Sequence, residues 1–212
     1  MHGGHTGGKD GRAPVPCRPG RRGAAGPSLL GRGGDATQAF ADSLAAGSWA
    51  ADDGIGLLLS QSEVLTASTS SFLESSAIDR LTAIGGTDAL ADDVLSSASS
   101  LGMTTERISG ATRFATATAI AEARGFTADA PAERVIVIEG QSDSAWSAGS
   151  VSAALSAVLD APIVLVNGDD VPAQTEAFLN DAFAPTDAGA AVTGIASPTA
   201  CAAVGTIAGL DA

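Results

Sequence analysis

An internal repeat constrains the fold of this chain more than any other feature of its sequence. The segment Thr66–Leu73 aligns with Pro172–Leu179 at an offset of 106 residues. The same offset places Leu57–Leu59 on Ile163–Leu165, and the alignment holds without a gap from Gly34 to the end of the first segment. Periodicity of this kind indicates copies of one structural unit that lie side by side. The chain is therefore expected to contain two related modules.

Short apolar runs of strand type alternate with segments of helical length along most of the chain. The expected strands are residues 54–60, 81–84, 134–139, 162–167 and 189–194. The expected helices are residues 36–51, 66–76, 88–101, 144–159, 172–182 and 198–208, together with the run from the turn at Gly110 to Arg124. Continuous apolar strands separated by helices indicate parallel sheets that are covered on both faces. The sequence therefore predicts an α/β protein.

The first copy of the repeat is expected to be incomplete. In the second copy, the strand Val135–Ile138 precedes Gly140, to which Gly34 corresponds at the same offset. The residues before Gly34, Pro27–Arg32, offer at most two residues of strand type, so the opening strand is expected to be missing. The predicted boundaries are residues 34–105 for the incomplete first module and residues 106–212 for the second.

Residues 1–33 differ in composition from the rest of the chain. Gly, Pro and Arg dominate them, and their few apolar residues show almost no periodic spacing. Such a segment buries too little surface to offset the entropy that is lost on ordering. We therefore expect a disordered tail, and this tail lacks the apolar stretch of a secretory signal peptide.

The charge of the remaining residues excludes several classes of partner. Residues 35–212 contain five arginines, no lysine and 23 acidic residues, which gives a net charge of −18. Nucleic acid is a poor partner for such a surface, because phosphate binding requires clustered cations. No membrane span is expected, since no apolar run reaches the roughly 18 residues that a transmembrane helix requires.

The segment Arg107–Ala117, with the sequence RISGATRFATA, resembles the signature that opens the cell wall binding repeat 2 family. The family pattern is Arg-Ile-x-Gly-x-Asp-Arg-Tyr-x-Thr-Ala, followed by a helix. Three further segments match family motifs: the strand at residues 135–138 that ends at Gly140, APIVL at residues 161–165, and IGGTDAL at residues 84–90. The resemblance covers about residues 34–209. The chain departs from the signature at Thr112, where the family has Asp, and at Phe114, where the family has Tyr.

The resemblance implies both a fold and a function. The implied fold is a Rossmann-like α/β module, present here as tandem modules with parallel sheets flanked by helices, in a family that usually carries three modules with pseudo-threefold symmetry. The implied function is non-catalytic anchoring of a surface protein to an anionic polymer of a bacterial cell wall, or to peptidoglycan. The implied location is extracellular, in the cell wall or at the cell surface. With only two modules, the remaining contacts are expected from a homo-oligomer or from other repeats of a longer chain.

The residues expected to bind the polymer lie within the signature: Arg107, Ser109, Thr112, Arg113 and Thr116. Guanidinium groups bind phosphate and carboxylate groups through paired hydrogen bonds, and hydroxyl groups bind those of sugars. The alternative is structural: the arginines pair with acids such as Asp88 or Glu106, and at least one hydroxyl caps the helix. Trp146 presents a similar choice between stacking on a sugar ring and packing in the core. Core packing is favoured there, because its counterpart Phe40 belongs to an apolar helical face.

Catalysis, metal binding and cofactor binding find little support in the sequence. Both histidines, His2 and His5, lie in the tail, so a Ser-His-Asp or Cys-His arrangement lacks its base in the folded part. No Gly-x-Gly-x-x-Gly follows a strand, and no P-loop motif is present. The adjacent acids at residues 52–53 and 169–170 lack the alternating spacing of a Ca²⁺ loop. The chain is therefore predicted not to be an enzyme and to require no cofactor or metal.

Two alternative functions remain open from the sequence. In one, the repeats are structural units that assemble a surface layer; in the other, the chain is the attachment fragment of a peptidoglycan hydrolase. The main objection to anchoring is the net charge, because an acidic body repels an anionic polymer within a Debye length of about 10 Å at 0.1 M salt. Binding then requires a local arginine cluster, high salt or bridging divalent cations.

Overall fold

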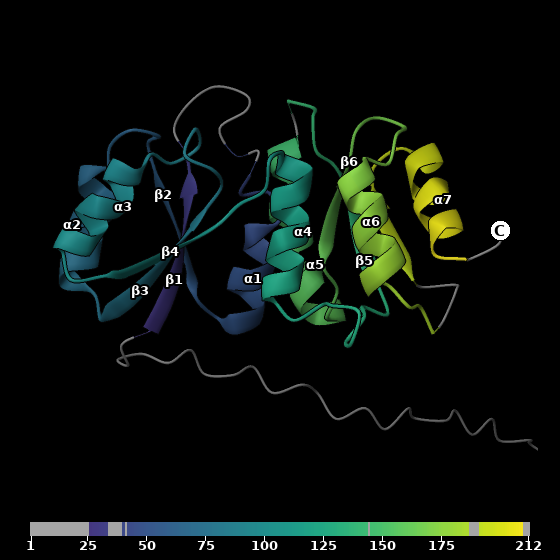
Figure 1. Ribbon diagram of the computed structural model, residues 1–212, viewed down its shortest axis with the longest axis horizontal. Coiled ribbons are helices and arrows are strands. Elements are labelled where there is room, and N and C mark those ends of the chain that lie inside the picture. The colour runs from purple at the N-terminus through teal and green to yellow at the C-terminus, as the bar shows by residue number, and fades with distance from the viewer. Residues whose placement is uncertain (1–25, 34–39, 41, 144, 187–190, 210–212) are drawn as a thin grey trace, which may run out of the picture.

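The computed structural model describes residues 26–33, 40, 42–143, 145–186 and 191–209. These residues form two α/β modules that lie side by side, each built on its own parallel sheet (Figure 1). The first sheet has the strand order β2-β1-β3-β4, and the second has the order β6-β5-β7. The strands of the first sheet are β1 (Gly26–Arg32), β2 (Gly56–Ser60), β3 (Ile78–Ile84) and β4 (Thr104–Ile108). Those of the second sheet are β5 (Val135–Glu139), β6 (Ile163–Val166) and β7 (Val192–Ile195).

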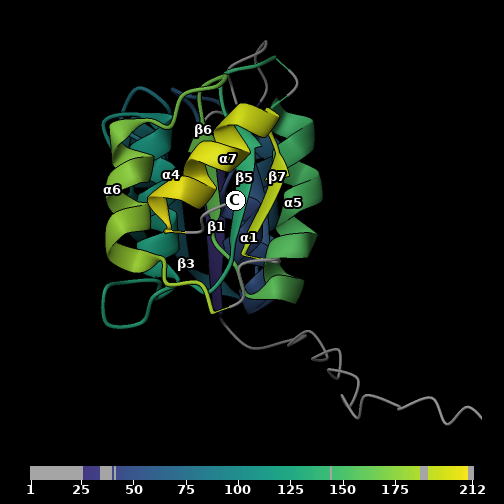
Figure 2. The same ribbon diagram turned by 90° about the vertical axis from the view of Figure 1, so that its right-hand side faces the viewer.

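Seven helices cover these sheets in the described part of the chain. They are α1 (Ala46–Asp53), α2 (Ala67–Ser75), α3 (Asp92–Ser100), α4 (Arg113–Ala123), α5 (Ala145–Leu159), α6 (Ala173–Ala182) and α7 (Pro198–Ile207). Helices α1, α4 and α5 lie in the middle of the molecule, between the two sheets (Figure 1). Figure 2 shows α4 and α6 on one side of the second sheet and α5 on the other. The predicted α/β fold with helix-covered parallel sheets is confirmed, and none of these seven helices is long and apolar enough to cross a bilayer.

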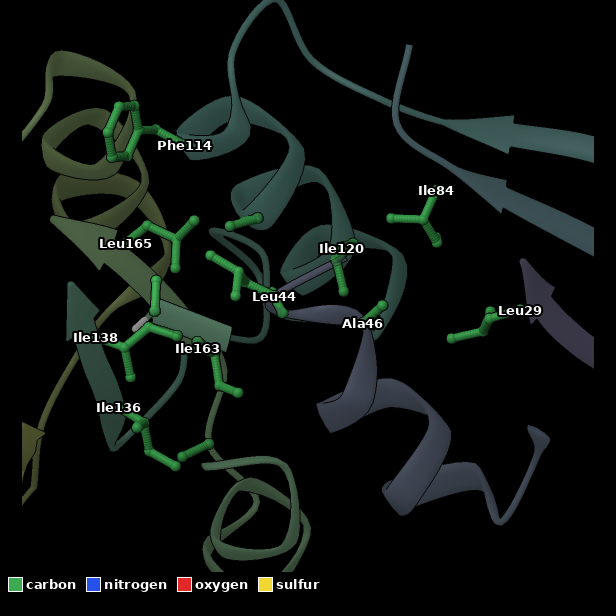
Figure 3. Packing of buried hydrophobic residues seen from close by; sticks show 14 residues of the cluster. Leu29, Leu44, Ala46, Ile84, Phe114, Ile120, Ile136, Ile138, Ile163 and Leu165 are labelled. Atoms are coloured by element: carbon green, nitrogen blue, oxygen red, sulfur yellow. The ribbon is translucent and has the colours of Figure 1, made fainter. Parts of the chain in front are cut away.

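One of the three hydrophobic clusters is shared by the two modules. Leu29 and Ile84 come from the first sheet, Ile136 and Ile163 come from the second, and Ile120 comes from α4. Each of these side chains is at most 1% exposed. Figure 3 shows them converging on the space between the sheets. Burial of apolar surface at about 25 cal/mol per Å² therefore stabilises the junction as well as each module.

Helices α1 and α5 approach each other closely because small residues face one another. A Cβ added to Gly47 would lie 2.9 Å from the Cβ of Ala153. A Cβ added to Gly149 would lie 3.0 Å from the carbonyl oxygen of Leu44. Interiors packed at this density leave no room for larger side chains. The contact between the modules is therefore a packed helix–helix interface.

The first module has an opening strand, contrary to the prediction from the sequence. β1 pairs in parallel with β2 on one side and with β3 on the other, and Leu29 and Leu30 are fully buried. Residues 26–32 are thus a central strand and not part of a disordered tail, while residues 1–25 lie outside the described residues. The strand has a short apolar run that ends at Gly31, whose Cβ would lie 2.3 Å from the Oγ of Ser43. Packing against Ser43 therefore requires glycine at position 31. Glycine is uncommon inside strands, so the sequence of this segment looks less like a strand.

The internal repeat is confirmed by two equivalent hydrogen bonds. The Oγ1 of Thr69 on α2 donates to the carbonyl oxygen of Leu59 at 2.6 Å. The Oγ1 of Thr175 on α6 donates to the carbonyl oxygen of Leu165 at 2.7 Å. Both pairs are related by the offset that the sequence repeat shows. Each helix is therefore fixed to its strand in the same way in the two modules.

At the opening strands, equivalent residues of the two modules are related by an offset that is one residue larger than in the rest of the repeat. The N–H of Gly33 donates to the carbonyl oxygen of Ser60 at 2.8 Å, and the N–H of Gly140 donates to that of Val166 at 2.9 Å. Gly33, and not Gly34, is therefore the counterpart of Gly140. Measured to Ser60 and Val166 on the strands that follow, the second module is therefore one residue shorter.

β4 is a strand that the sequence pattern does not predict. It pairs in parallel with β3, so Arg107 and Ile108 of the signature complete the sheet of the first module. The predicted boundary between residues 105 and 106 falls inside this strand. β4 lies at the edge of the sheet and lacks a continuous apolar run, so only its pairing identifies it as a strand.

The helix expected at residues 36–51 begins later than predicted. α1 begins at Ala46, after a turn at residues 42–45, and ends before Gly54, which has a left-handed φ of 65°. Residues 34–39 and 41 lie outside the described residues. The other predicted strands and helices are observed at the expected places, with ends that differ by a few residues.

Candidate binding site

A polar crevice opens at the carboxyl ends of the strands of the first sheet. Asp42 follows β1, residues 86–89 follow β3, and residues 110–113 follow β4 and lead into α4. The crevice has a volume of ≈370 Å³. Ligands of parallel sheets usually bind beyond the strand ends where successive connections leave in opposite directions, and β1 is such a point, with β2 and β3 on its two sides. The crevice is therefore the candidate binding site.

Two glycines allow the loops of the crevice to pass close to one another. Gly85 has a φ of +107°, and a Cβ there would lie 2.8 Å from the Cβ of Ala89. A Cβ on Gly110 would lie 2.3 Å from the Cβ of Ala115 and 2.8 Å from the backbone nitrogen of Thr116. A positive φ and contacts this short favour glycine over every other residue. These two positions therefore set the backbone path of the crevice wall.

Two threonines of the signature hold the first turn of α4. Thr112 is exposed, and its Oγ1 accepts the N–H of Ala115 at 3.2 Å as a helix N-cap. Thr116 is fully buried, and its Oγ1 accepts the N–H of Gly110 at 3.1 Å. The same hydroxyl lies 2.9 Å from Oδ1 of Asp42. Thr116 therefore ties the loop after β1 to the start of α4.

Arg113 is the signature arginine that lines the crevice. It is half-buried, and its Nη1 donates to the carbonyl oxygen of Gly140 at 2.7 Å. Burial lowers the pKa of Arg113 from its ordinary value, and the carboxylates of Asp42 and Glu139 oppose this shift. The guanidinium thus joins the end of β5 to α4 and places a cation at the crevice.

Arg107 binds the backbone of its own module. Its Nη1 donates to the carbonyl oxygen of Gly85 at 2.7 Å, and its Nη2 donates to that of Leu90 at 2.8 Å. Its ion pair is with Asp92 at 3.0 Å, which is not one of the two acids expected from the sequence. These bonds hold the loop after β3, which forms one wall of the crevice.

The five predicted residues therefore occupy three kinds of position. Thr112 and Arg113 line the crevice, Arg107 and Thr116 hold its walls, and Ser109 is exposed outside its lining. Sequence reasoning missed Asp42, which lines the crevice, accepts a hydrogen bond from Thr116 and opposes the lowering of the Arg113 pKa by its charge. Only the position of Asp42 after the opening strand could have marked it as a site residue, and the sequence pattern does not predict that strand.

Glu139 lies at the corresponding edge of the second sheet. Its Oε1 accepts the N–H of Gln141 at 2.5 Å, and its Oε2 accepts the N–H of Gly168 at 2.6 Å. One carboxylate thus joins the loops after β5 and β6. In the first module, by contrast, the loops line an open crevice.

A buried arginine that sequence reasoning did not single out lies at the junction of the modules. The side chain of Arg124 is 1% exposed. Its Nη1 donates to Oγ of Ser156 at 3.1 Å and to the carbonyl oxygen of Ala161 at 3.2 Å, and its Nη2 lies 3.6 Å from Oδ2 of Asp52 on α1. The guanidinium carbon is 5.1 Å from the ring centre of Phe126. Burial lowers the pKa of Arg124, with Asp52 as the main opposing charge.

Trp146 is 55% exposed, so the predicted packing in the core is wrong. It lines an apolar pocket of ≈180 Å³ between the modules, with Phe40 and Leu44 on one side and Leu59 of β2 on another. The structure places this indole on the surface because its helix, α5, packs on α1 through other positions.

Among the described residues, no group of three or more His, Cys, Asp or Glu side chains is close enough to hold a metal ion.

Comparisons with known proteins identify relatives of both modules. The model of the family Cell wall binding domain 2 (CWB2) matches residues 22–95 and 107–197. Cwp6 from Clostridium difficile is similar in structure with a TM-score of 0.67 and 22% sequence identity over 89% of this chain, which spans 28% of the Cwp6 chain. Cwp8 from Clostridium difficile gives a TM-score of 0.64 and 19% identity over 88% of this chain, which spans 30% of that chain. No curated protein matches.

Proposed function

The chain belongs to the Cell wall binding domain 2 family, and we propose from this premise that it is a non-catalytic module that attaches a surface protein to an anionic cell-wall polymer. Family membership supports a cell-wall-associated binding module at the cell surface or wall. One observation carries the finer claim. The crevice at the strand ends of the first sheet combines the guanidinium of Arg113 with hydroxyl and backbone groups of the adjacent loops.

The lining of the crevice indicates which part of a polymer it binds. Thr87 and Thr112 offer hydroxyl groups, and Arg113 offers a planar cation that suits a phosphate or carboxylate group. Asp42 and Asp88 also line the crevice, where they accept hydrogen bonds from sugar hydroxyls and repel further anionic groups. The proposed ligand is therefore a sugar unit with one anionic group, held at Arg113.

The charge of the protein predicts an unusual dependence on salt. Residues 35–212 carry a net charge of −18, and a single arginine lines the crevice. Long-range repulsion weakens as the Debye length falls from about 30 Å at 0.01 M salt to about 10 Å at 0.1 M. Retention on cell walls is therefore expected to rise over this range. A steep fall with salt would instead indicate binding through many cations, and would contradict the proposed site.

Retention on purified cell walls tests the proposed site directly. Arg113→Ala is expected to weaken retention several-fold while the circular dichroism spectrum stays unchanged. Arg80→Ala is the matched control, because Arg80 is exposed near the amino end of β3, at the opposite end of the sheet. Equal retention of the two variants would show that the crevice does not bind the polymer.

Assembly of a surface layer is the second candidate function, and α5 favours it. This helix contains no charged residue. Trp146, Val151 and Val158 on it are 55%, 66% and 81% exposed. Val151 and Val158 are seven residues apart and share one helical face, and exposed apolar patches often mark protein contacts, so this face is suited to contact another protein. Sedimentation of the chain with and without Val151→Asp would reveal such self-association.

A further inference from the structure

The second module holds a carboxylate of its own chain at the carboxyl ends of two strands. β5 is the central strand of its sheet, and Glu139 is the last residue of this strand. Parallel sheets bind ligands beyond the carboxyl ends of their strands. We propose that the loops after β5 and β6 form an anion-binding site, which Glu139 occupies and thereby closes to the carboxylate or phosphate groups of ligands. This proposal does not rest on binding of a wall polymer at the crevice of the first module.

Each oxygen of the Glu139 carboxylate accepts a backbone N–H from a different loop. Its Oε1 lies 2.5 Å from the nitrogen of Gln141, in the loop after β5. Its Oε2 lies 2.6 Å from the nitrogen of Gly168, in the loop after β6. N–H groups bond an ionised oxygen more strongly than a neutral one, and converging backbone N–H groups form anion sites in many proteins. The two loops therefore hold this carboxylate as they would hold an anion from solution.

The turn that carries the second donor is fixed by its own backbone. Asn167 and Asp170 exchange two backbone hydrogen bonds of 3.0 Å each. Gly168, between them, has a φ of +60°, a conformation that favours glycine. These features set the direction of the Gly168 N–H without any contribution from Glu139. The donor is therefore expected to stay in place when the carboxylate is removed.

The first donor is fixed in a similar way and has a cation beside it. The N–H of Gly140, the residue before Gln141, donates to the carbonyl oxygen of Val166 at 2.9 Å. The carbonyl oxygen of Gly140 accepts Nη1 of Arg113 at 2.7 Å. The negative charge of Glu139 opposes the lowering of the Arg113 pKa by burial, which shows that the two charges interact. The surroundings of the site therefore favour a negative charge in it.

The first module has an arginine at the corresponding position. β1 pairs Arg32 with Ser60, and β5 pairs Glu139 with Val166. Ser60 and Val166 are themselves related by the offset of the repeat. A guanidinium group only donates hydrogen bonds and cannot accept a backbone N–H. Closure by a carboxylate at this position is therefore specific to the second module.

Rescue by acetate tests the proposal on the full chain. Gln141 and Gly168 are exposed, so a small anion can reach both N–H groups once the side chain of Glu139 is shortened. Glu139→Ala is expected to lower the thermal unfolding midpoint by a few degrees. Sodium acetate is expected to restore most of this loss, because a ligand that binds only the folded state stabilises it. Sodium chloride at the same ionic strength is expected to restore none of it.

Glu133→Ala is the matched control for the rescue. Glu133 is exposed and precedes β5, so it lies at the opposite end of the same strand. Its removal changes the net charge as much as the removal of Glu139 does. Acetate is therefore expected to affect this variant no more than it affects the wild type.

Amide signals in nuclear magnetic resonance spectra locate the anion. In Glu139→Ala, acetate is expected to shift the signals of Gln141 and Gly168 with one shared dissociation constant. In the wild type these signals are expected to stay in place, because the carboxylate fills the site. Glu139→Gln keeps the size of the side chain and removes its charge. It is expected to move the Gly168 proton signal upfield, as its hydrogen bond weakens, and to admit no acetate.

Three results would overturn the proposal. One is a midpoint of Glu139→Ala that acetate raises no more than that of Glu133→Ala. Another is a wild-type chain in which acetate shifts the two amide signals as far as in the variant, since Glu139 would then not close the site. The third is a Gly168 signal that is unchanged in Glu139→Gln, and this measurement decides the matter even if Glu139→Ala does not fold.

Discussion

Replacement of Arg124 tests how the two modules are held together. Its side chain is 1% exposed and contacts α5, the loop after it and, through Asp52, α1 of the first module. Arg124→Ala removes this side chain and leaves a cavity. Ser156 and Ala161 lose a donor but keep a hydrogen bond to each other. The cost is therefore mainly that of a large-to-small replacement, and we expect a loss of about 3 kcal/mol in the free energy of unfolding.

Arg124→Met separates the contribution of packing from that of charge. Methionine fills most of the space and carries no charge. Asp52 is 39% exposed and remains solvated when its partner is removed. Within the described residues, Nε and Nη2 of Arg124 have no hydrogen-bond partner, so burying the guanidinium carries a desolvation cost that methionine avoids. Arg124→Met is therefore expected to cost less than about 1 kcal/mol.

Urea unfolding followed by far-ultraviolet circular dichroism measures both variants. The expected order of stability is wild type, then Arg124→Met, then Arg124→Ala, with most of the loss in the last step. Asp52→Asn serves as a control for the ion pair, and is expected to cost less than about 1 kcal/mol because Asp52 is partly exposed. If methionine cost as much as alanine, the charge and its hydrogen bonds would dominate, and the packing argument would be refuted.

Further measurements test the repeat and the crevice. Thr175→Val is expected to cost about 1–2 kcal/mol in urea unfolding and Thr69→Val less, since the carbonyl left behind in the second module is more deeply buried; equal losses would contradict this. Gly110→Ala is expected to lower stability by about 1–3 kcal/mol through the short contact with α4, and an unchanged midpoint would show that the loop relaxes freely. Arg107→Ala is expected to cost about 2 kcal/mol by removing two charge-assisted bonds to carbonyl groups. A stable Arg107→Ala chain that no longer binds cell walls would instead assign this arginine to the polymer.

Much of the architecture follows from patterns that lie within short windows of the sequence. The alternation of apolar runs and helical segments predicted the parallel sheets, because a strand buried on both faces must be continuously apolar. The constant offset between the repeated segments predicted two modules, and equivalent threonines bear it out in the structure. The hydroxyl-rich start of α4 predicted a helix cap, which Thr112 provides. In each case, the interaction partners lie close in sequence or are set by periodicity.

Other features were decided by partners that are distant in the chain. β1 is a strand because β2 and β3 enclose it on both sides, although its own apolar run is short. β4 is a strand because β3 offers it an edge. Asp42 reaches the crevice only because β1 places it there, and Trp146 lies on the surface because α5 uses its small residues to pack on α1. Local sequence records which segments can be helix or strand, whereas burial depends on which surfaces meet, and the tertiary structure alone brings those surfaces together.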